Sequence, residues 1–250
     1  MKLNIIIPAY NEEKRIEKTL ESYSKFFLDE MKNDFEILII LNGCRDQTRE
    51  IVERFSNKKK NIKFKEFNEA IGKGGAIIEG FKIADSELIG YVDADGSTSP
   101  KTFYDLVENI NSHDGIIASR WIKGAIIKKK QPITRRISSR GFNLLVKLFF
   151  GLKIRDTQCG AKLFKGKAIK KITPELGITR WAFDIDLLYR MKRNGFDVVE
   201  IPTEWEDIEG SRLNLKKTIL EMFVSIIRLR LIYSPFKFTI KIYDKLFYKK

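Results

Sequence analysis

The first half of the chain alternates short apolar runs with longer stretches in which apolar residues recur every three or four positions. Side chains repeat every two residues along a strand and every 3.6 along a helix, so the short runs predict strands and the longer stretches predict helices. The expected strands are Leu3–Pro8, Phe35–Leu41, Ile62–Phe67, Leu88–Asp93 and Gly115–Ser119. The expected helices are Glu12–Phe27, Asp46–Ser56, Gly74–Ala84 and Pro100–Asn111. This alternation predicts an α/β fold, a mostly parallel sheet with helices on both faces.

The second half has a less regular pattern. Gln131–Gly151 begins as a cationic loop and becomes an apolar helix that Gly151 ends. Phe183–Asn194 has the spacing of an amphipathic helix, and Val198–Trp205 that of a further strand. We therefore assign residues 1–215 to one α/β domain.

Residues 216–250 are expected to form amphipathic C-terminal helices. The stretch Lys216–Tyr233 is very apolar, but Glu221, Arg228 and Arg230 interrupt it, so it does not suit a bilayer-spanning helix. Beyond Pro235, aromatic and aliphatic residues alternate with lysines, a composition typical of a helix lying in the interfacial plane of a membrane. A helical hairpin that packs on the domain or forms a dimer contact fits the same pattern.

Positive charge is concentrated in two parts of the chain. Lysine and arginine outnumber acidic residues by 47 to 33, a formal net charge of +14. Residues 120–171 hold 16 basic residues against the single acid Asp156, and residues 213–250 hold 9 against 2. Such stretches indicate an anionic partner, either nucleic acid or a membrane and its lipid headgroups. The sequence has no RNA-binding signature and no recognition helix, so a nucleic-acid partner is not expected.

Cysteine and histidine usage excludes several kinds of site. Cys44 and Cys159 are too few for a disulfide framework and too far apart in sequence to suggest zinc, which favours a reduced, cytosolic setting. The single histidine, His113, lies in a polar turn, so histidine metal sites and Ser-His-Asp triads are excluded. We expect neither a signal peptide nor a spanning helix, and therefore a peripheral protein on the cytoplasmic face of a membrane.

Polar residues follow three of the predicted strands. Ligands bind beyond the carboxyl ends of the strands in open α/β sheets, so these residues are candidates for a substrate site. They are Pro8, Tyr10 and Glu12 after the first strand, Asn42 after the second, and Asp93 and Asp95 after the fourth. The loop Gly72-Lys73-Gly74-Gly75 adds backbone donors and a cation at a helix start, which suit a diphosphate. It lacks the Gly-Lys-Ser/Thr ending of a P-loop.

Asp93 and Asp95 form the strongest candidate metal site. Alternation along an extended chain points both carboxylates to the same side, where they can share one Mg²⁺ or Mn²⁺ and leave coordination positions for phosphate oxygens. An isolated Asp-x-Asp equally fits a polar strand end followed by an Asx turn, so this pattern alone leaves both interpretations open.

Three motifs, taken together, resemble the family 2 glycosyltransferases with the GT-A fold. They are Ile5-Ile6-Ile7-Pro8-Ala9-Tyr10-Asn11-Glu12-Glu13, the loop Gly72-Lys73-Gly74-Gly75-Ala76, and the strand that leads into Asp93-Ala94-Asp95-Gly96. In the second half, Ala118–Gly124 and Asp156–Phe164 resemble motifs of the polyprenyl-phosphate sugar synthases. Arg180–Tyr189 and Trp205–Leu213 are most similar to the dolichyl-phosphate β-glucosyltransferase group. The resemblance covers roughly residues 1–215.

The resemblance implies transfer of one sugar, with inversion, from a nucleotide sugar to a dolichyl or polyprenyl phosphate. It favours UDP-glucose over GDP-mannose. It implies that Asp93 and Asp95 hold a metal on the donor diphosphate and that Arg120 and Arg135 clamp the acceptor phosphate. The implied catalytic residues are Asp95, Arg120, Arg135 and Asp184, and Asp156, Gln158 and Arg212 join the substrate-binding residues.

Two departures from the family pattern concern specificity. Leu41-Asn42-Gly43-Cys44 stands where the family has Asp-Asp-Gly-Ser, and Gly177 stands where processive polysaccharide synthases have glutamine. The second departure favours a single transfer. An acceptor phosphate has its second pKa near 6, so it is largely ionised at neutral pH and needs no strong base.

Three alternative functions remain open from the sequence. They are a mannose synthase that uses GDP-mannose, a glycosyltransferase with a hydroxyl acceptor, and a basic nucleic-acid-binding protein. A hydroxyl acceptor would need Asp184 or Asp186 as general base. Nothing in the sequence predicts an oligomeric state.

Overall fold

The computed structural model describes residues 1–129, 133–177, 181–206 and 215–247, without the side chains of residues 128, 129, 133–137, 206, 215–219 and 245. The strands are β1 Leu3–Ala9, β2 Phe35–Asn42, β3 Ile62–Phe67, β4 Leu88–Tyr91, β5 Gly115–Ser119, β6 Ile126–Lys129, β7 Lys162–Lys165, β8 Val198–Pro202 and β9 Glu204–Glu206. The α-helices are α1 Ile16–Met31, α2 Thr48–Lys58, α3 Lys73–Ile83, α4 Pro100–Asn109, α5 Ile133–Phe150, α6 Gly166–Ile172, α7 Phe183–Arg193, α8 Leu215–Ile232 and α9 Ile240–Phe247.

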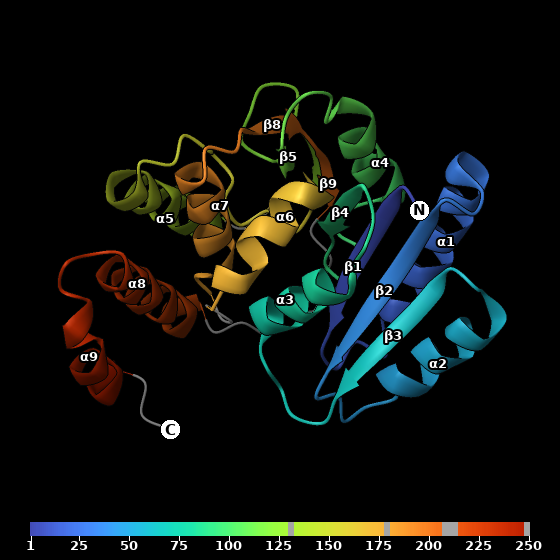
Figure 1. The fold of residues 1–250 in the computed structure, drawn as a ribbon, viewed down its shortest axis with the longest axis horizontal. Helices are drawn as coiled ribbons and strands as arrows, with labels where there is room; N and C mark the ends of the chain where they lie inside the picture. The colour runs from blue at the N-terminus through green and yellow to red at the C-terminus, as the bar shows by residue number, and fades with distance from the viewer. Residues whose placement is uncertain (130–132, 178–180, 207–214, 248–250) are drawn as a thin grey trace.

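A seven-stranded sheet in the order β3-β2-β1-β4-β7-β5-β8 forms the centre of the molecule (Figure 1). Every neighbouring pair is parallel except the two that involve β7, which runs antiparallel between β4 and β5. β6 and β9 pair with each other in a separate two-stranded sheet. The mostly parallel α/β sheet predicted from the sequence is therefore confirmed.

Helices cover both faces of the sheet, as contacts at two neighbouring strands show. A Cβ at Gly90 in β4 would meet the Phe103 ring of α4 at 2.8 Å, so α4 packs on the face to which Gly90 points. Ile6 of β1 is paired with Tyr91, the neighbour of Gly90 in β4. The Ile6 side chain packs against α3, where a Cβ at Gly80 would lie 2.6 Å from it. Because successive residues of a strand point to opposite faces, α3 and α4 lie on opposite sides.

The predicted boundaries are wrong in several places. The first helix begins at Ile16 instead of Glu12, because Asn11 turns the chain with φ 54° and residues 12–15 form a turn. α5 begins at Ile133, where a cationic loop was expected. The expected strand Val198–Trp205 is two strands: β8 ends at Pro202, which has no N–H to donate, and β9 pairs with β6. β6, β7 and α6 were not predicted.

The C-terminal helices pack at the end of the molecule opposite β3 and α2 (Figure 1). α8 contacts α5, and its Ile226 and Leu229 are fully buried. The Tyr233 hydroxyl, just beyond α8, donates to Asp186 Oδ1 of α7 at 2.5 Å. Two hydrogen bonds of 2.6 and 2.9 Å join Arg228 to Asp244 of α9. These contacts join the C-terminal helices to the rest of the molecule, and the division of the chain at residue 215 stays a prediction.

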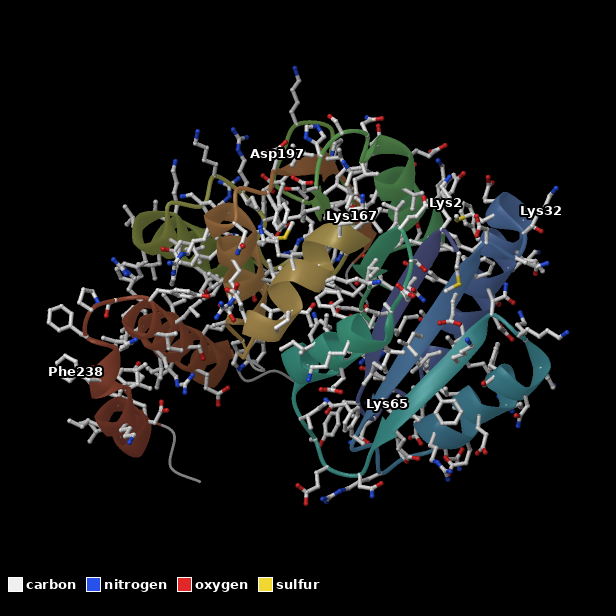
Figure 2. All side chains as sticks on the ribbon, viewed as in Figure 1. Lys2, Lys32, Lys65, Lys167, Asp197 and Phe238 are labelled. Carbon is white, nitrogen blue, oxygen red and sulfur yellow. The ribbon has the colours of Figure 1, made fainter. Side chains whose placement is uncertain are left out.

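Several apolar side chains on this end of the molecule face solvent. Phe238, which is 73% exposed, lies at its outer edge (Figure 2). The exposed apolar residues of α5, α8 and α9 are Leu144, Leu148, Phe149, Leu220, Phe223, Ile242, Leu246 and Phe247. Across the ranges described above, none of the helices combines the length and apolar character needed to cross a membrane. Contact with a membrane surface stays a prediction.

Candidate active site

Asp93 and Asp95 lie in a loop at the carboxyl end of β4, and two side chains of α1 donate hydrogen bonds to this loop. The Thr19 hydroxyl donates to the Ala94 carbonyl at 3.0 Å, and the buried Tyr23 hydroxyl donates to the Thr98 carbonyl at 3.0 Å. Asp95 Oδ1 accepts from the Ser97 N–H at 2.9 Å, which is an Asx turn. This turn uses one carboxylate oxygen of Asp95, so it is compatible with a metal bound at the other.

Lys73 pairs with Asp93 across the strand ends. Its Nζ lies 2.5 Å from Asp93 Oδ1, and it is the first residue of α3. Burial raises the pKa of Asp93; Lys73 opposes this effect, and the like charge of Asp95 adds to it. Two neighbouring carboxylates with incomplete charge compensation suit a divalent cation.

Asp93 and Asp95 cannot complete a coordination sphere by themselves. Within residues 1–129, 133–177, 181–206 and 215–247, no three His, Cys, Asp or Glu side chains gather closely enough to hold a metal. The donor set therefore fits a hard cation that takes its other ligands from a bound diphosphate and water.

Gly160 lies directly against the Asp93 carboxylate. A Cβ at this position would be 2.2 Å from Asp93 Oδ2 and 2.6 Å from Asp93 Cγ, far below van der Waals contact. The residue at position 160 must therefore be glycine if Asp93 is to keep its place. This fixes the loop that begins at Asp156 against the metal-binding candidate.

Arg120 and Asp156 form a buried, bidentate pair beside that loop. Arg120 Nε and Nη2 donate to Asp156 Oδ2 and Oδ1 at 2.8 Å each, and the Arg120 backbone N–H donates to Oδ2 at 2.9 Å. Asp156 is fully buried, and the Arg120 side chain is 13% exposed. Arg120 was predicted to clamp the acceptor phosphate, but here its guanidinium engages a carboxylate with two of its three nitrogens. Burial lowers the pKa of Arg120, but Asp156 raises it above the ordinary value, and the negative charge of Asp93 contributes a smaller rise.

Asp184 accepts the hydrogen bonds of a buried network that includes Lys162 and Tyr91. Lys162 of β7, fully buried, donates to Asp184 Oδ1 at 2.6 Å and to the Cys159 carbonyl at 2.6 Å. The Tyr91 hydroxyl donates to the same Asp184 oxygen at 2.5 Å. Burial disfavours the charged form of Asp184, but Lys162, Lys73 and the Tyr91 hydroxyl outweigh it and lower its pKa below the ordinary value. A carboxylate with a lowered pKa is a weak general base.

A row of alternating tryptophan and arginine side chains extends from this centre. The Arg120 guanidinium carbon lies 5.3 Å from the Trp205 ring centroid and 6.0 Å from that of Trp121, and Arg140 of α5 lies 5.3 Å from the Trp121 centroid. Trp205 also forms a β-bridge with Thr98, in the loop that holds Asp95. Trp181 lies elsewhere, with its Nε1 donating to Glu221 of α8 at 3.0 Å.

The remaining predicted residues are placed as follows. Glu12 accepts from Arg15 Nε at 2.7 Å; burial raises its pKa against the effect of Arg15, with smaller contributions from Asp95 and Asp93. Tyr10 is 52% exposed beyond β1, and Pro8 lies within that strand, half-buried. Asn42 is buried, and its Oδ1 accepts from the Ile71 N–H at 2.7 Å.

Gln158 Nε2 has no observed partner, and two other predicted residues lie wholly or partly outside what the structure describes. Gln158 Nε2 is buried and has no hydrogen-bond partner among the residues that the structure describes. The side chain of Arg135 and the whole of Arg212 lie outside the described residues. The structure thus brings Glu12, Lys73, Asp93, Asp95, Arg120, Asp156 and Asp184 to one edge of the sheet and leaves Arg135 and Arg212 unplaced.

The sequence analysis assigned no role to four residues of this site: Tyr91, Trp121, Gly160 and Lys162. Lys162 had a recognisable signal, because a lysine inside the apolar run Ala161-Lys162-Leu163-Phe164 needs a buried partner if the run is a strand. No signal along the chain connected Gly160 with Asp93, since the contact exists only after β7 has inserted beside β4.

Comparison with known proteins shows the family of this chain. The sequence model of the family described as "Glycosyl transferase family 2" matches residues 4–173. The chain is 33% identical over 244 residues to "Dolichyl-phosphate beta-glucosyltransferase" of Dictyostelium discoideum, covering 92% of this chain and 74% of that protein. It is 30% identical over 249 residues to the human protein of the same name, covering 92% and 75%.

A solved structure shares the fold. It is glucosyl-3-phosphoglycerate synthase from Mycobacterium tuberculosis in complex with Mn²⁺ and UDP-glucose, with a TM-score of 0.66 and 13% identity, covering 92% of this chain and 78% of that one. The GT-A fold expected from the sequence is confirmed by this likeness.

Proposed function

This chain belongs to glycosyltransferase family 2, and we propose that it transfers one glucose residue from UDP-glucose to a dolichyl or polyprenyl phosphate, with inversion at the anomeric carbon. The names of its relatives support the glucosyl group and the lipid phosphate acceptor. The UDP-glucose complex of the similar fold supports the donor. The pairing of Lys73 with Asp93, next to Asp95, supports the reaction most directly. It brings two carboxylates that can bind a metal ion together with a lysine that can bind a phosphate.

At the donor end, Asp93 and Asp95 would hold Mg²⁺ or Mn²⁺, which would neutralise the departing diphosphate as a Lewis acid. We expect Lys73 to exchange its ion pair with Asp93 for one with a diphosphate oxygen, because it is the first residue of α3 and its side chain is 44% exposed. The backbone N–H groups at the start of α3 add the partial positive charge of a helix N-terminus. Arg212 is assigned to the same diphosphate by resemblance.

The nucleoside and the sugar would occupy the remaining strand ends. We assign the nucleoside to Pro8, Tyr10, Glu12 and Asn42, which lie at the carboxyl ends of β1 and β2 or just beyond β1. Gln158 is assigned to the sugar, because its buried Nε2 has no partner within the described part of the chain and can donate to a hydroxyl.

At the acceptor end, the phosphate is the nucleophile and needs cations more than a base. Arg120 presents the one guanidinium nitrogen that Asp156 does not bind, and Arg135 is assigned to the same phosphate by resemblance. The lowered pKa of Asp184 supports a structural role for this residue instead of proton abstraction. The exposed apolar residues of α5, α8 and α9 support a peripheral position on a membrane, where such a lipid resides.

Asp184→Asn separates a phosphate acceptor from a hydroxyl acceptor when it is compared with Lys162→Met. Each substitution removes one charge from the same buried ion pair, so each should destabilise the protein by about 3–5 kcal/mol. We expect the two variants to lose similar activity per folded molecule, measured as initial rate divided by the folded fraction from circular dichroism. If Asp184 is a general base, Asp184→Asn will lose about 10²- to 10⁴-fold more activity than Lys162→Met.

A panel of nucleotide sugars tests the proposed function. Purified protein, vesicles that contain dolichyl phosphate, and Mg²⁺ are incubated with labelled UDP-glucose, GDP-mannose, UDP-galactose or UDP-N-acetylglucosamine. We expect label to enter the chloroform-extractable lipid from UDP-glucose far faster than from the others. If the lipid is labelled mainly from GDP-mannose, the proposed donor is wrong and GDP-mannose takes its place. If no donor labels the lipid, the proposed function is refuted.

A further inference from the structure

Arg140 lies near the site, and its guanidinium does not pair with a carboxylate in the described part of the chain. It is exposed on α5, and no ion pair of Arg140 occurs among the residues that the structure describes. By contrast, Arg120 is bound to Asp156, Lys73 to Asp93, and Lys162 to Asp184. Arg140 is therefore available to an anion that arrives from solution, whereas the other cations must first share or give up a carboxylate.

Trp121 holds Arg140 in place and adds a second donor. The Arg140 guanidinium lies 5.3 Å from the Trp121 ring centroid, and the Arg120 guanidinium lies 6.0 Å from the same centroid. The indole Nε1–H of Trp121 is buried and has no hydrogen-bond partner in the described part of the chain. A buried donor without a partner is unfavourable, so this atom indicates a ligand that accepts its hydrogen bond.

The α5 face that carries Arg140 continues as an apolar surface. Leu144 and Leu148 follow at intervals of four residues, which places all three on one side of the helix. Leu144 is 58% exposed and Leu148 is 70% exposed. A cation followed by exposed leucines along one helix face complements a molecule with a phosphate at one end and a hydrocarbon chain behind it.

We propose that Arg140 and Trp121 form a docking site for the acceptor's phosphate group, with the isoprenoid chain lying along Leu144 and Leu148. Arg140 binds two phosphate oxygens and the Trp121 Nε1–H donates to a third, both before and during sugar transfer. Arg120, which contacts the same Trp121 ring, and Trp205 connect this site to the Asp95 loop. This role rests on the proposed lipid phosphate acceptor and specifies how that acceptor is captured.

Kinetics with varied lipid concentration test this site. Hydrogen bonds to charged groups contribute about 1.5–3 kcal/mol, so Arg140→Ala should raise KM for dolichyl phosphate about 10- to 100-fold. The kcat and the KM for UDP-glucose should change less than about threefold, because Arg140 would bind the phosphate equally well in the ground state and in the transition state. Arg140→Lys should recover part of the loss, since it restores the charge without the planar fork.

Lys147→Ala is the matched control, because Lys147 is an exposed cation on the same helix, about 10 Å further along. If Arg140→Ala behaves like Lys147→Ala in an otherwise active enzyme, the docking site is wrong while the proposed function stands. If the unsubstituted protein makes no lipid product, the proposed function fails first.

A binding measurement without turnover tests the site independently. Farnesyl phosphate should change the tryptophan fluorescence of the protein, and farnesol or inorganic phosphate should do so only at concentrations at least about tenfold higher. Trp121→Phe keeps an aromatic ring beside Arg140 but removes the N–H, so it should abolish most of the change and weaken binding several-fold. An equal response to inorganic phosphate, or a full response in Trp121→Phe, would overturn the assignment.

Discussion

Replacing Asp95 with asparagine is expected to lower the rate of sugar transfer about 1,000-fold at saturating UDP-glucose and Mg²⁺. Losing a ligand of the cation on the leaving diphosphate removes several kcal/mol of transition-state stabilisation, and each 1.36 kcal/mol is tenfold in rate. Asp95 is a cleaner target than Asp93, because Asp93→Asn would also leave Lys73 without its ion pair. Asparagine retains an oxygen that can accept from the Ser97 N–H, so the Asx turn should persist.

Asp105→Asn provides the matched control for this experiment. Asp105 lies on the exposed face of α4 and pairs with Lys101 at 2.7 Å, a surface contact that contributes at most about 1 kcal/mol. Both variants should melt within a few degrees of the unsubstituted protein. Mn²⁺ together with UDP should raise the melting temperature of Asp105→Asn but not of Asp95→Asn. Activity of Asp95→Asn within about tenfold of the unsubstituted protein would mean that the pair does not hold the diphosphate's cation.

Gly160→Ala is expected to reduce activity about 100-fold without unfolding the protein. The added methyl would lie 2.2 Å from Asp93 Oδ2, so the carboxylate must move by about an ångström, and misplacement of that size costs about 10²-fold in rate. Gly160 does not have a positive φ, so alanine brings no backbone strain. Initial rates over a range of Mg²⁺ concentrations should show a higher metal requirement in the variant.

Gly141→Ala is the control for adding a methyl group elsewhere. A Cβ at Gly141 meets no atom within 4 Å, and the residue lies inside α5, where alanine is favoured over glycine by up to about 1 kcal/mol. This variant should keep full activity and gain slightly in stability. Full activity in Gly160→Ala as well would show that Asp93 tolerates displacement, and its role as a metal ligand would then be wrong.

The sequence predicted the first half of the fold well because its strands are short runs rich in apolar residues, nearly continuous in β1 and β2 and alternating with charged residues in β3. β1 and β2 pair in parallel over seven residue pairs, Leu3↔Phe35 to Ala9↔Leu41, with side chains buried on both faces. β7 escaped prediction for the opposite reason. Its four residues begin and end with lysine, and the partner of the buried Lys162 is Asp184 of α7, 22 residues further along the chain.

The location of the site could also be predicted, but the ion pairs between its side chains could not. The position of Asp93 and Asp95 after an apolar strand, and of Lys73 at a helix start, was enough to place them at one edge of the sheet. The sequence offered no means of predicting that Arg120 is occupied by Asp156 while Arg140 remains open. Such pairings depend on distances between segments that only the folded chain brings together.

Mass spectrometry of the lipid product, with matched acceptors, tests the central claim most directly. Purified protein is given UDP-glucose, Mg²⁺ and vesicles that contain either dolichyl phosphate or dolichol, the same lipid without the phosphate. The predicted result is a dolichyl phosphate heavier by one hexose, which loses that hexose in mild acid, and no product from dolichol. Glucosylated dolichol, addition of several hexoses, or an unmodified dolichyl phosphate would contradict single transfer to a lipid phosphate.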